Sequence, residues 1–259
     1  SVPHLRFLDS QAWNRVVEYV GIANGSQDRW RKALADAAGT TPERVSVHVT
    51  HVHDAPFDDD TVEELLAKNG LSGKAFDVAN AHAAVEKAAA ALRESMQHPR
   101  LVTQVGYGEA PVHQVASNRR ILGPDGKVKA VRYTATKDPA IRAEPEGVID
   151  PLLKMLTFFN GERPLVSLSY YATHPQSHFG KGDVTSEFVG LARAEHERTH
   201  AGLTLVHFNG AAGNVAAGKY NDGTPELRFI YDESVERGMR LSQLIDRAVD
   251  EDRQHKKED

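Results

Sequence analysis

The segment 45–56 reads VSVHVTHVHDAP, in which valines alternate with other residues and three histidines and an aspartate lie among or after them. An extended chain alternates its side chains between two faces, so His51 and His53 are predicted to share one face with the preceding valines. Neutral imidazole and carboxylate are ordinary zinc ligands, and Asp54 stands beside the two histidines. We expect either a divalent-metal site at the end of this strand or a polar strand terminus with solvated histidines.

A second histidine is predicted to lie at the end of a strand farther along the chain. In YYATHPQSH, an alternating segment runs into His174, and Pro175 ends the strand because proline cannot donate to the ladder. The carboxyl ends of strands are where α/β folds place their ligands. His174 is therefore a candidate metal ligand, with a plain turn histidine as the alternative.

The segment 196–200 matches H-E-x-x-H, the helical pattern in which two histidines bind zinc and the glutamate acts as base in metalloproteases. The helix carrying it is predicted to bury a different stripe, made of Val184, Phe188, Leu191 and Ala192. At about 100° per residue, His196 and His200 project to the side of that stripe, among charged neighbours. A zinc protease using His196, Glu197 and His200 is therefore a minor alternative.

The glycine-rich segment FNGAAGNVAAG, residues 208–218, is predicted to form a loop after a buried strand. Its glycines allow successive N–H groups to converge on an anion or an oxyanion. It lacks the G-K-[ST] ending of a phosphate-binding loop and contains no serine, so it supplies no serine nucleophile.

The surrounding elements alternate between helices and strands. Residues 10–20 fit a helix or a short strand, Ser26 is predicted to cap a helix that ends at Ala37, and strand 45–53 follows. Farther along we predict helices at 58–68, 74–97, 185–200 and 232–250, strands at 101–112, 152–160, 164–173 and 203–210, a hairpin around the turn GPDG, and a loop at 137–150. This order predicts a single α/β layered domain over 1–259, with a mixed central sheet flanked by helices.

Composition narrows the classes of function. The 259 residues carry a net charge of −5, and the acidic and basic residues are scattered along the chain. No cluster of basic residues therefore indicates binding of nucleic acid. The chain has no cysteine, which excludes disulfides and thiolate metal sites, and its thirteen histidines draw attention to metal or proton chemistry. No apolar run approaches the roughly 20 residues of a transmembrane helix. We expect a soluble protein and leave its compartment open, including a secreted or periplasmic one after removal of a signal.

Four blocks occur in the order seen in neutral ceramidases: Thr50–Pro56, Ser117–Arg120, Tyr171–Ser177 and Phe208–Val215. They read T-H-V-H-D-A-P, S-N-R-R, Y-A-T-H-P-Q-S and F-N-G-A-A-G-N-V. In that family the blocks resemble T-H-T-H-S-G-P, N-x-N-R-S-P, F-A-x-H-x-x-S and S-N-x-G-D-V-S-P-N. The chain thus resembles the N-terminal catalytic region of the family, and in particular its ceramidase-like bacterial members.

The resemblance implies a zinc-dependent amidase that cleaves a small-molecule or lipid-like N-acyl substrate, with a metal-activated water as the nucleophile. By motif match His51 and His174 are the zinc ligands, His53 lies beside the metal or stabilises the oxyanion, and Arg119 holds polar groups of the substrate. The residues expected to line the substrate and oxyanion pocket are Asn118, Asn209, Gly210, Gly213 and Asn214.

Two departures from the family pattern follow from the same match. The position of the family's proposed catalytic serine is Ala216 here, and the family's glutamate and tyrosine zinc ligands correspond to positions beyond residue 259. A catalytic zinc usually has three protein ligands, so another carboxylate, a second chain or a missing segment is expected to complete the site. The candidates for an additional carboxylate ligand are Asp54, Glu18 and Glu187. Among the acidic residues, Glu187 and Asp183 are the first candidates for the catalytic base. A non-catalytic binding module with a degenerate metal site is the alternative from another functional class.

Overall fold

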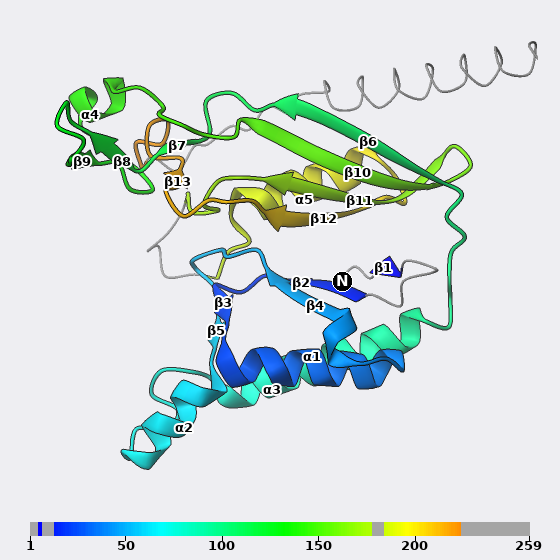
Figure 1. Ribbon diagram of the computed structural model, residues 1–259. Helices are drawn as coiled ribbons and strands as arrows, with labels where there is room; N and C mark the ends of the chain where they lie inside the picture. The colour runs from blue at the N-terminus through cyan, green and yellow to red at the C-terminus, as the bar shows by residue number, and fades with distance from the viewer. Residues whose placement is uncertain (1–4, 7–12, 178–183, 224–259) are drawn as a thin grey trace, which may run out of the picture. The chain divides into compact units, whose positions relative to one another are not determined.

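The computed structural model describes residues 5–6, 13–177 and 184–223 (Figure 1). The helix predicted at 232–250 and Asp183 lie outside the described residues. The chain divides into two compact units: unit 1 comprises 1–100 and 178–187, and unit 2 comprises 101–177 and 188–259. Among the described residues, no helix combines the length and apolarity that a membrane crossing requires.

Unit 1 contains a three-stranded sheet in the order β1-β2-β4, formed by Leu5–Arg6, Trp13–Val17 and Val45–Val49. Strands β1 and β2 are antiparallel, whereas β2 and β4 are parallel. The segment 10–20, which fitted both a helix and a strand, therefore provides a strand, because its β-branched Val16 and Val17 pair along β4. Short strands β3 (Gly21–Ile22) and β5 (Phe57–Asp58) also pair in parallel.

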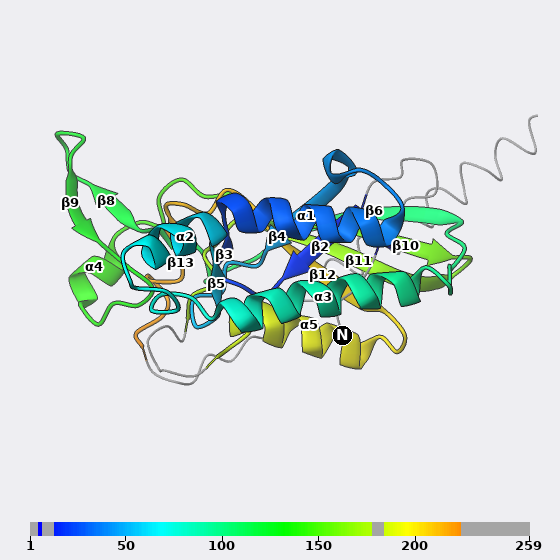
Figure 2. The ribbon, with the colours of Figure 1, turned by 90° about the horizontal axis from the view of Figure 1, so that it is seen from below.

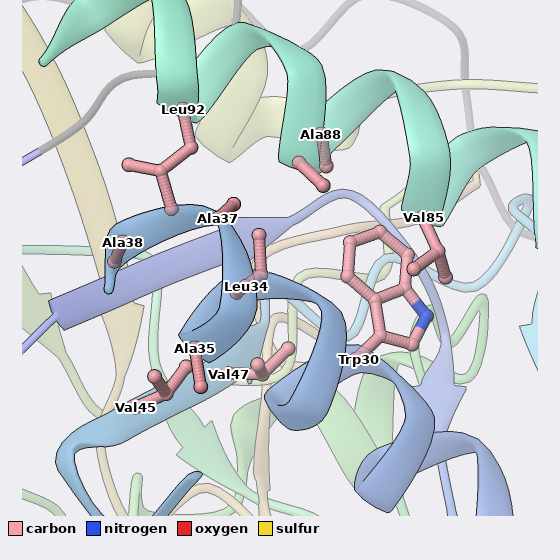
Figure 3. Close-up of a cluster of buried hydrophobic side chains, with 11 residues drawn as sticks. Trp30, Leu34, Ala35, Ala37, Ala38, Val45, Val47, Val85, Ala88 and Leu92 are labelled. Atoms are coloured by element: carbon pink, nitrogen blue, oxygen red, sulfur yellow. The ribbon is translucent and has the colours of Figure 1, made fainter. Parts of the chain in front are cut away.

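Two long helices of unit 1, α1 (Asn24–Ala38) and α3 (Val78–Ser95), run side by side (Figure 2). Their shared core contains Trp30 and Leu34 of α1, Val85 and Leu92 of α3, and valines from β4 (Figure 3). The alanine-rich face of α3 lets the helices approach closely, and the buried apolar surface holds the layer on the sheet.

The ends of these helices differ in part from the prediction. Ser26 lies inside α1, and its hydroxyl donates to Asp58 at 2.8 Å, so it is no N-cap. Gly39 ends the helix in a left-handed conformation, as expected, with φ of 64°. The 3-10 turn η1 (Pro42–Arg44) leads into β4, and Asp59 caps α2 (Asp60–Lys68) by accepting from the N–H of Val62.

Unit 2 contains a four-stranded sheet in the order β12-β11-β10-β6 (Figure 1). The strands are β6 (Gln104–Pro111), β10 (Leu152–Asn160), β11 (Arg163–Tyr171) and β12 (Thr204–Asn209). Strands β11 and β12 are parallel and the other pairs are antiparallel, which confirms the predicted α/β class with a mixed sheet. The helix α5 (Glu187–Thr199) lies in the connection between β11 and β12, as a parallel crossover requires.

Shorter elements extend from the end of this sheet. Strands β8 (Arg120–Leu122) and β9 (Val128–Val131) form the predicted hairpin, while β7 (Ser117–Asn118) pairs with β13 (Val215–Ala216). The prediction of a continuous loop at 137–150 is wrong, because α4 (Pro139–Ala143) forms within it. Asp138 caps that helix by accepting from two of its first N–H groups.

Candidate functional site

In unit 1, His51 follows β4 in a loop and not in an extended strand. Its φ is 61°, its N–H donates to the carbonyl of Tyr19 at 3.0 Å, and its Nδ1 donates to the carbonyl of Val20 at 2.6 Å. The prediction of an alternating strand face through His53 is therefore wrong. Strand β4 ends at Val49, and the left-handed His51 then changes the direction of the chain. The N–H groups of Thr50 and His51 donate to the carbonyls of Val17 and Tyr19, at the end of β2 and in the turn after it.

The two predicted histidines are nevertheless neighbours in that loop. The rings of His51 and His53 meet edge to face with centroids 4.8 Å apart, and both side chains are half-buried. The carbonyl of Asp54 accepts from the N–H of Thr185 at 2.8 Å, and the hydroxyl of Thr185 accepts from the N–H of Glu187. Unit 1 thus brings the histidine loop beside the segment that carries Glu187.

Glu187 is fully buried, with an exposed fraction of 0%, and it adopts a φ of 55°. A left-handed conformation costs a non-glycine residue roughly 1–3 kcal/mol and persists only where the surrounding structure enforces it. Both His51 and Glu187 adopt it, so two of the predicted site residues occupy strained positions.

In unit 2, His174 lies just beyond β11 and is buried. Its N–H donates to the carbonyl of Val215 at 2.9 Å, and its Nδ1 donates to the carbonyl of Ala212 at 2.8 Å. The predicted glycine-rich loop therefore supports this histidine directly, through backbone groups.

His51 and His174 share one chemical feature. A carbonyl oxygen can only accept, so each Nδ1 must carry the proton, which leaves the lone pair on Nε2. Backbone carbonyls orient metal-ligating histidines in this way and set which nitrogen is available to the ion. The donor chemistry of both residues thus fits a divalent metal.

Three of the four sequence blocks converge within unit 2. The N–H of Arg119 donates to the carbonyl of Asn214 at 2.7 Å, and the side-chain oxygen of Asn214 accepts from both the N–H and the guanidinium of Arg120. Strand β7 pairs with β13, which joins Ser117 to Ala216. The segment S-N-R-R, the end of β11 and the loop after β12 thus form one connected structure.

The predicted pocket residues have different surroundings. Gly210 donates its N–H to the carbonyl of Tyr171 and lies so close to Ala172 that an added Cβ would be 3.0 Å from the alanine Cβ. Gly213 is exposed and has open space around it, and Asn209 is half-buried at the end of β12. The amide of Asn118, oriented to satisfy both partners, pairs with the N–H and carbonyl of Val148.

Arg119 itself is half-buried, with its guanidinium carbon 5.9 Å from the centroid of the Tyr133 ring. A guanidinium over an aromatic face keeps its N–H donors in plane and available to a ligand. Ala216, at the position of the family's serine, is fully buried in β13.

The H-E-x-x-H segment differs from its prediction. His196 lies on the buried face of α5 with an exposed fraction of 2%, whereas Leu191 is 55% exposed, so the predicted apolar stripe is wrong except at Phe188, which is buried. The Oε1 of Glu197 accepts from the N–H of Leu205 at 2.8 Å, on the outer edge of β12. This carboxylate holds the helix to an edge strand, and its bond to the backbone disfavours a role as a protease base.

The sequence interpretation missed Arg132. This arginine directly follows β9, is 1% exposed, and donates to four backbone carbonyls. Burial lowers the pKa of its guanidinium. The sequence offered only its place in the predicted hairpin, which does not distinguish a buried arginine from a solvated one.

Comparisons with known proteins add information about the fold. No protein-family model matches the chain. Proteins named ribosome-binding factor A match short stretches: one from Nitrosospira multiformis is 69% identical over 35 residues, 14% of this chain and 28% of that protein. Another from Nitrosococcus oceani is 37% identical over 89 residues, 33% of this chain and 64% of that protein.

Two solved structures match most of the chain. A ceramidase complexed with C2 superposes with a TM-score of 0.54 and 16% identity, over 88% of this chain and 34% of that one. The neutral ceramidase from Pseudomonas aeruginosa gives a TM-score of 0.51 and 17% identity, over 88% and 35%. This chain therefore has a ceramidase-like fold and spans about a third of the length of those solved structures.

Proposed function

We propose that this chain is the part of a ceramidase-type hydrolase that carries the metal site and cleaves an amide bond in a lipid-like N-acyl substrate. The observation that carries the proposal is the same hydrogen bond at both His51 and His174, in each of which Nδ1 donates to a backbone carbonyl. The ceramidase-like fold and the order of the four sequence blocks support it.

In this proposal His51 and His174 hold a zinc ion, and His53 is the third candidate donor because its ring lies against that of His51. When bound, zinc supplies Lewis-acid polarisation of a carbonyl and lowers the pKa of a water molecule from about 15.7 toward about 7. Glu187 and Asp54 are the candidate base and additional ligand. A second chain, or a segment outside this sequence, is an alternative source of further ligands.

The remaining residues bind and orient the substrate. Arg119 donates hydrogen bonds to its polar groups, and the loop from Asn209 to Asn214 forms one wall. Because Ala216 replaces the family's serine and is buried, no hydroxyl at that position takes part. The nucleophile is therefore water, and the proton transfer is assigned to a side chain of the histidine loop or to Glu187.

Metal content and hydrolysis test the proposal together. We expect about one zinc per chain by inductively coupled plasma mass spectrometry, and at least a tenfold loss of zinc affinity in both His51→Ala and His174→Ala. A shared ion requires both single variants to lose the same zinc. The exposed His98→Ala is the matched control, and His200→Ala tests the protease alternative; both should keep the metal.

Hydrolysis of N-acyl substrates of several chain lengths then separates the remaining alternatives. Zinc-dependent release of the free acid supports the hydrolase, whereas zinc binding without turnover supports a binding module with a degenerate site. Unchanged zinc in both His51→Ala and His174→Ala would contradict the shared site. Loss of zinc in His200→Ala alone would indicate the H-E-x-x-H segment instead.

A further inference from the structure

Arg132 is a buried cation that is held by backbone carbonyls in unit 2. Its Nη1 donates to Glu144 at 2.9 Å and its Nη2 to Pro145 at 2.7 Å, while Nε and Nη2 donate to Asn118 at 3.2 and 3.1 Å. Nη2 also lies 3.3 Å from the carbonyl of Glu146. The rigid fork of a guanidinium carries five N–H donors, so one side chain can join two separate segments of backbone in fixed geometry.

A second cation strengthens the same arrangement. The ammonium of Lys219 donates to the carbonyl of Arg142 at 2.6 Å and to that of Glu144 at 2.5 Å. Glu144 thus accepts from both Arg132 and Lys219 through one carbonyl oxygen. Hydrogen bonds from charged donors are about twice as strong as neutral ones, so the segment 142–146 is firmly held.

The backbone of residues 118 and 119 is hydrogen-bonded to Glu146 of this segment, to Arg132 and to Asn214. The N–H of Asn118 donates to the carbonyl of Glu146, and its own carbonyl accepts from Arg132. The N–H of Arg119 donates to Asn214, and its carbonyl accepts from the N–H of Arg132, each at 2.7 Å. Every backbone polar group of these two residues has a partner, so the point from which the Arg119 side chain leaves the backbone is fixed.

We propose that Arg132 is a positioning residue for Arg119, setting the direction in which that guanidinium meets the substrate. The inference rests on the proposed function, in which Arg119 binds polar groups of an N-acyl substrate. Arg132 contacts no substrate itself. Its guanidinium acts by holding the carbonyl of Asn118, the residue before Arg119, and by fixing the backbone next to Tyr133, over which the Arg119 guanidinium lies.

The matched variants are Arg132→Lys and Arg198→Lys in the full chain. Lysine keeps the positive charge but has no planar fork, so it cannot reach the carbonyls of both segments. Arg198 lies exposed on α5 and bonds to Glu195, so its replacement changes the same side-chain type away from Arg119. We expect Arg132→Lys to raise KM about tenfold with little change in kcat, as loss of uniform substrate binding by Arg119 predicts, and Arg198→Lys to change neither.

A double-mutant cycle distinguishes positioning from a general structural role. In an Arg119→Ala chain, Arg132→Lys should change kcat/KM less than about twofold, because the side chain that it positions is gone. A purely structural arginine would lower kcat/KM by the same factor in both backgrounds. An equal loss in both backgrounds would therefore overturn the inference.

Hydrogen exchange provides a readout that does not need turnover. Arg132→Lys should speed exchange of the amides of residues 117–120 at least tenfold and leave those of β10 and β11 unchanged. Faster exchange throughout the sheet, or unchanged exchange at 117–120, would contradict positioning. If the parent chain hydrolyses no N-acyl substrate, the proposed function fails, and this comparison still decides the role of Arg132.

Discussion

The buried charge of Asp58 is surrounded by several hydrogen bonds. Asp58 is 2% exposed and accepts from the hydroxyl of Ser26, the guanidinium of Arg29 at 2.7 Å and the indole of Trp30. Arg132 is also buried, and its guanidinium donates to several backbone carbonyls. A buried charge that loses its partners keeps the cost of its desolvation, so such sites are sensitive to single substitutions.

Replacing Asp58 with asparagine should therefore destabilise the protein by about 1–3 kcal/mol, because Ser26 and Trp30 lose a charged acceptor and Arg29 keeps only its ion pair with Asp60. Asp36→Asn is the matched control, since its ion pair with Lys32 is exposed and such pairs contribute less than about 1 kcal/mol. Urea denaturation followed by circular dichroism measures both. Equal effects of the two variants would show that burial of Asp58 does not determine its contribution.

At the scale of elements, the ends of parallel strands bring the candidate residues of unit 2 together. Strands β11 and β12 run in the same direction, so His174 and the loop that begins at Asn209 emerge at the same edge of the sheet. Gly210 lies close against Ala172 of the segment that follows β11. Gly213, three residues later, has no such neighbour.

The two glycines therefore predict opposite outcomes for one substitution. Gly210→Ala should cost about 1–3 kcal/mol, because its Cβ would press on Ala172 and displace the loop that supports His174. Gly213→Ala should change stability by less than about 0.5 kcal/mol. Thermal and urea unfolding measure the costs, and Ala172→Gly should recover part of the loss in the Gly210→Ala chain. A neutral Gly210→Ala would mean that the loop does not pack against β11 in this way.

At the scale of the whole molecule, each unit has its own sheet, and unit 1 has a clear helix-on-sheet core. Buried tyrosines occur in both. Burial raises the pKa of Tyr19 in unit 1 and that of Tyr171 in unit 2. Burial first, and then its hydrogen bond to Glu146, raise the pKa of Tyr220 to about 12.

These tyrosines make the whole protein sensitive to alkaline pH. The unfolded chain releases the phenol proton near pH 10 while the folded Tyr220 keeps it to about pH 12, so rising pH favours unfolding in that interval. The contribution of these tyrosines to the free energy of unfolding should be nearly constant from about pH 7 to 9. It should fall between about pH 10 and 12. Tyr220→Phe should reduce this slope in urea titrations, and the exposed Tyr133→Phe should not. A slope that Tyr220→Phe leaves unchanged would remove this explanation.

Local patterns predicted most of the elements correctly. The hairpin at GPDG, the helix end at Gly39 and strands β10, β11 and β12 follow from turn chemistry and apolar runs that act within a few residues. The errors at His51 and on α5 have a different origin. A left-handed residue and a buried histidine are each enforced by packing against segments distant in sequence, which no local period records.

The amino-acid sequence by itself determined the α/β class, the order of the four blocks and the presence of histidines at the ends of buried strands, because these depend on residue types and their spacing. Only the tertiary structure decided which nitrogen of His51 and His174 bears a proton, that Glu197 bonds to the edge of β12, and that Arg132 is buried among carbonyls. The physical reason is that hydrogen-bond partners and burial arise where distant segments meet, and neither can be read from neighbours along the chain.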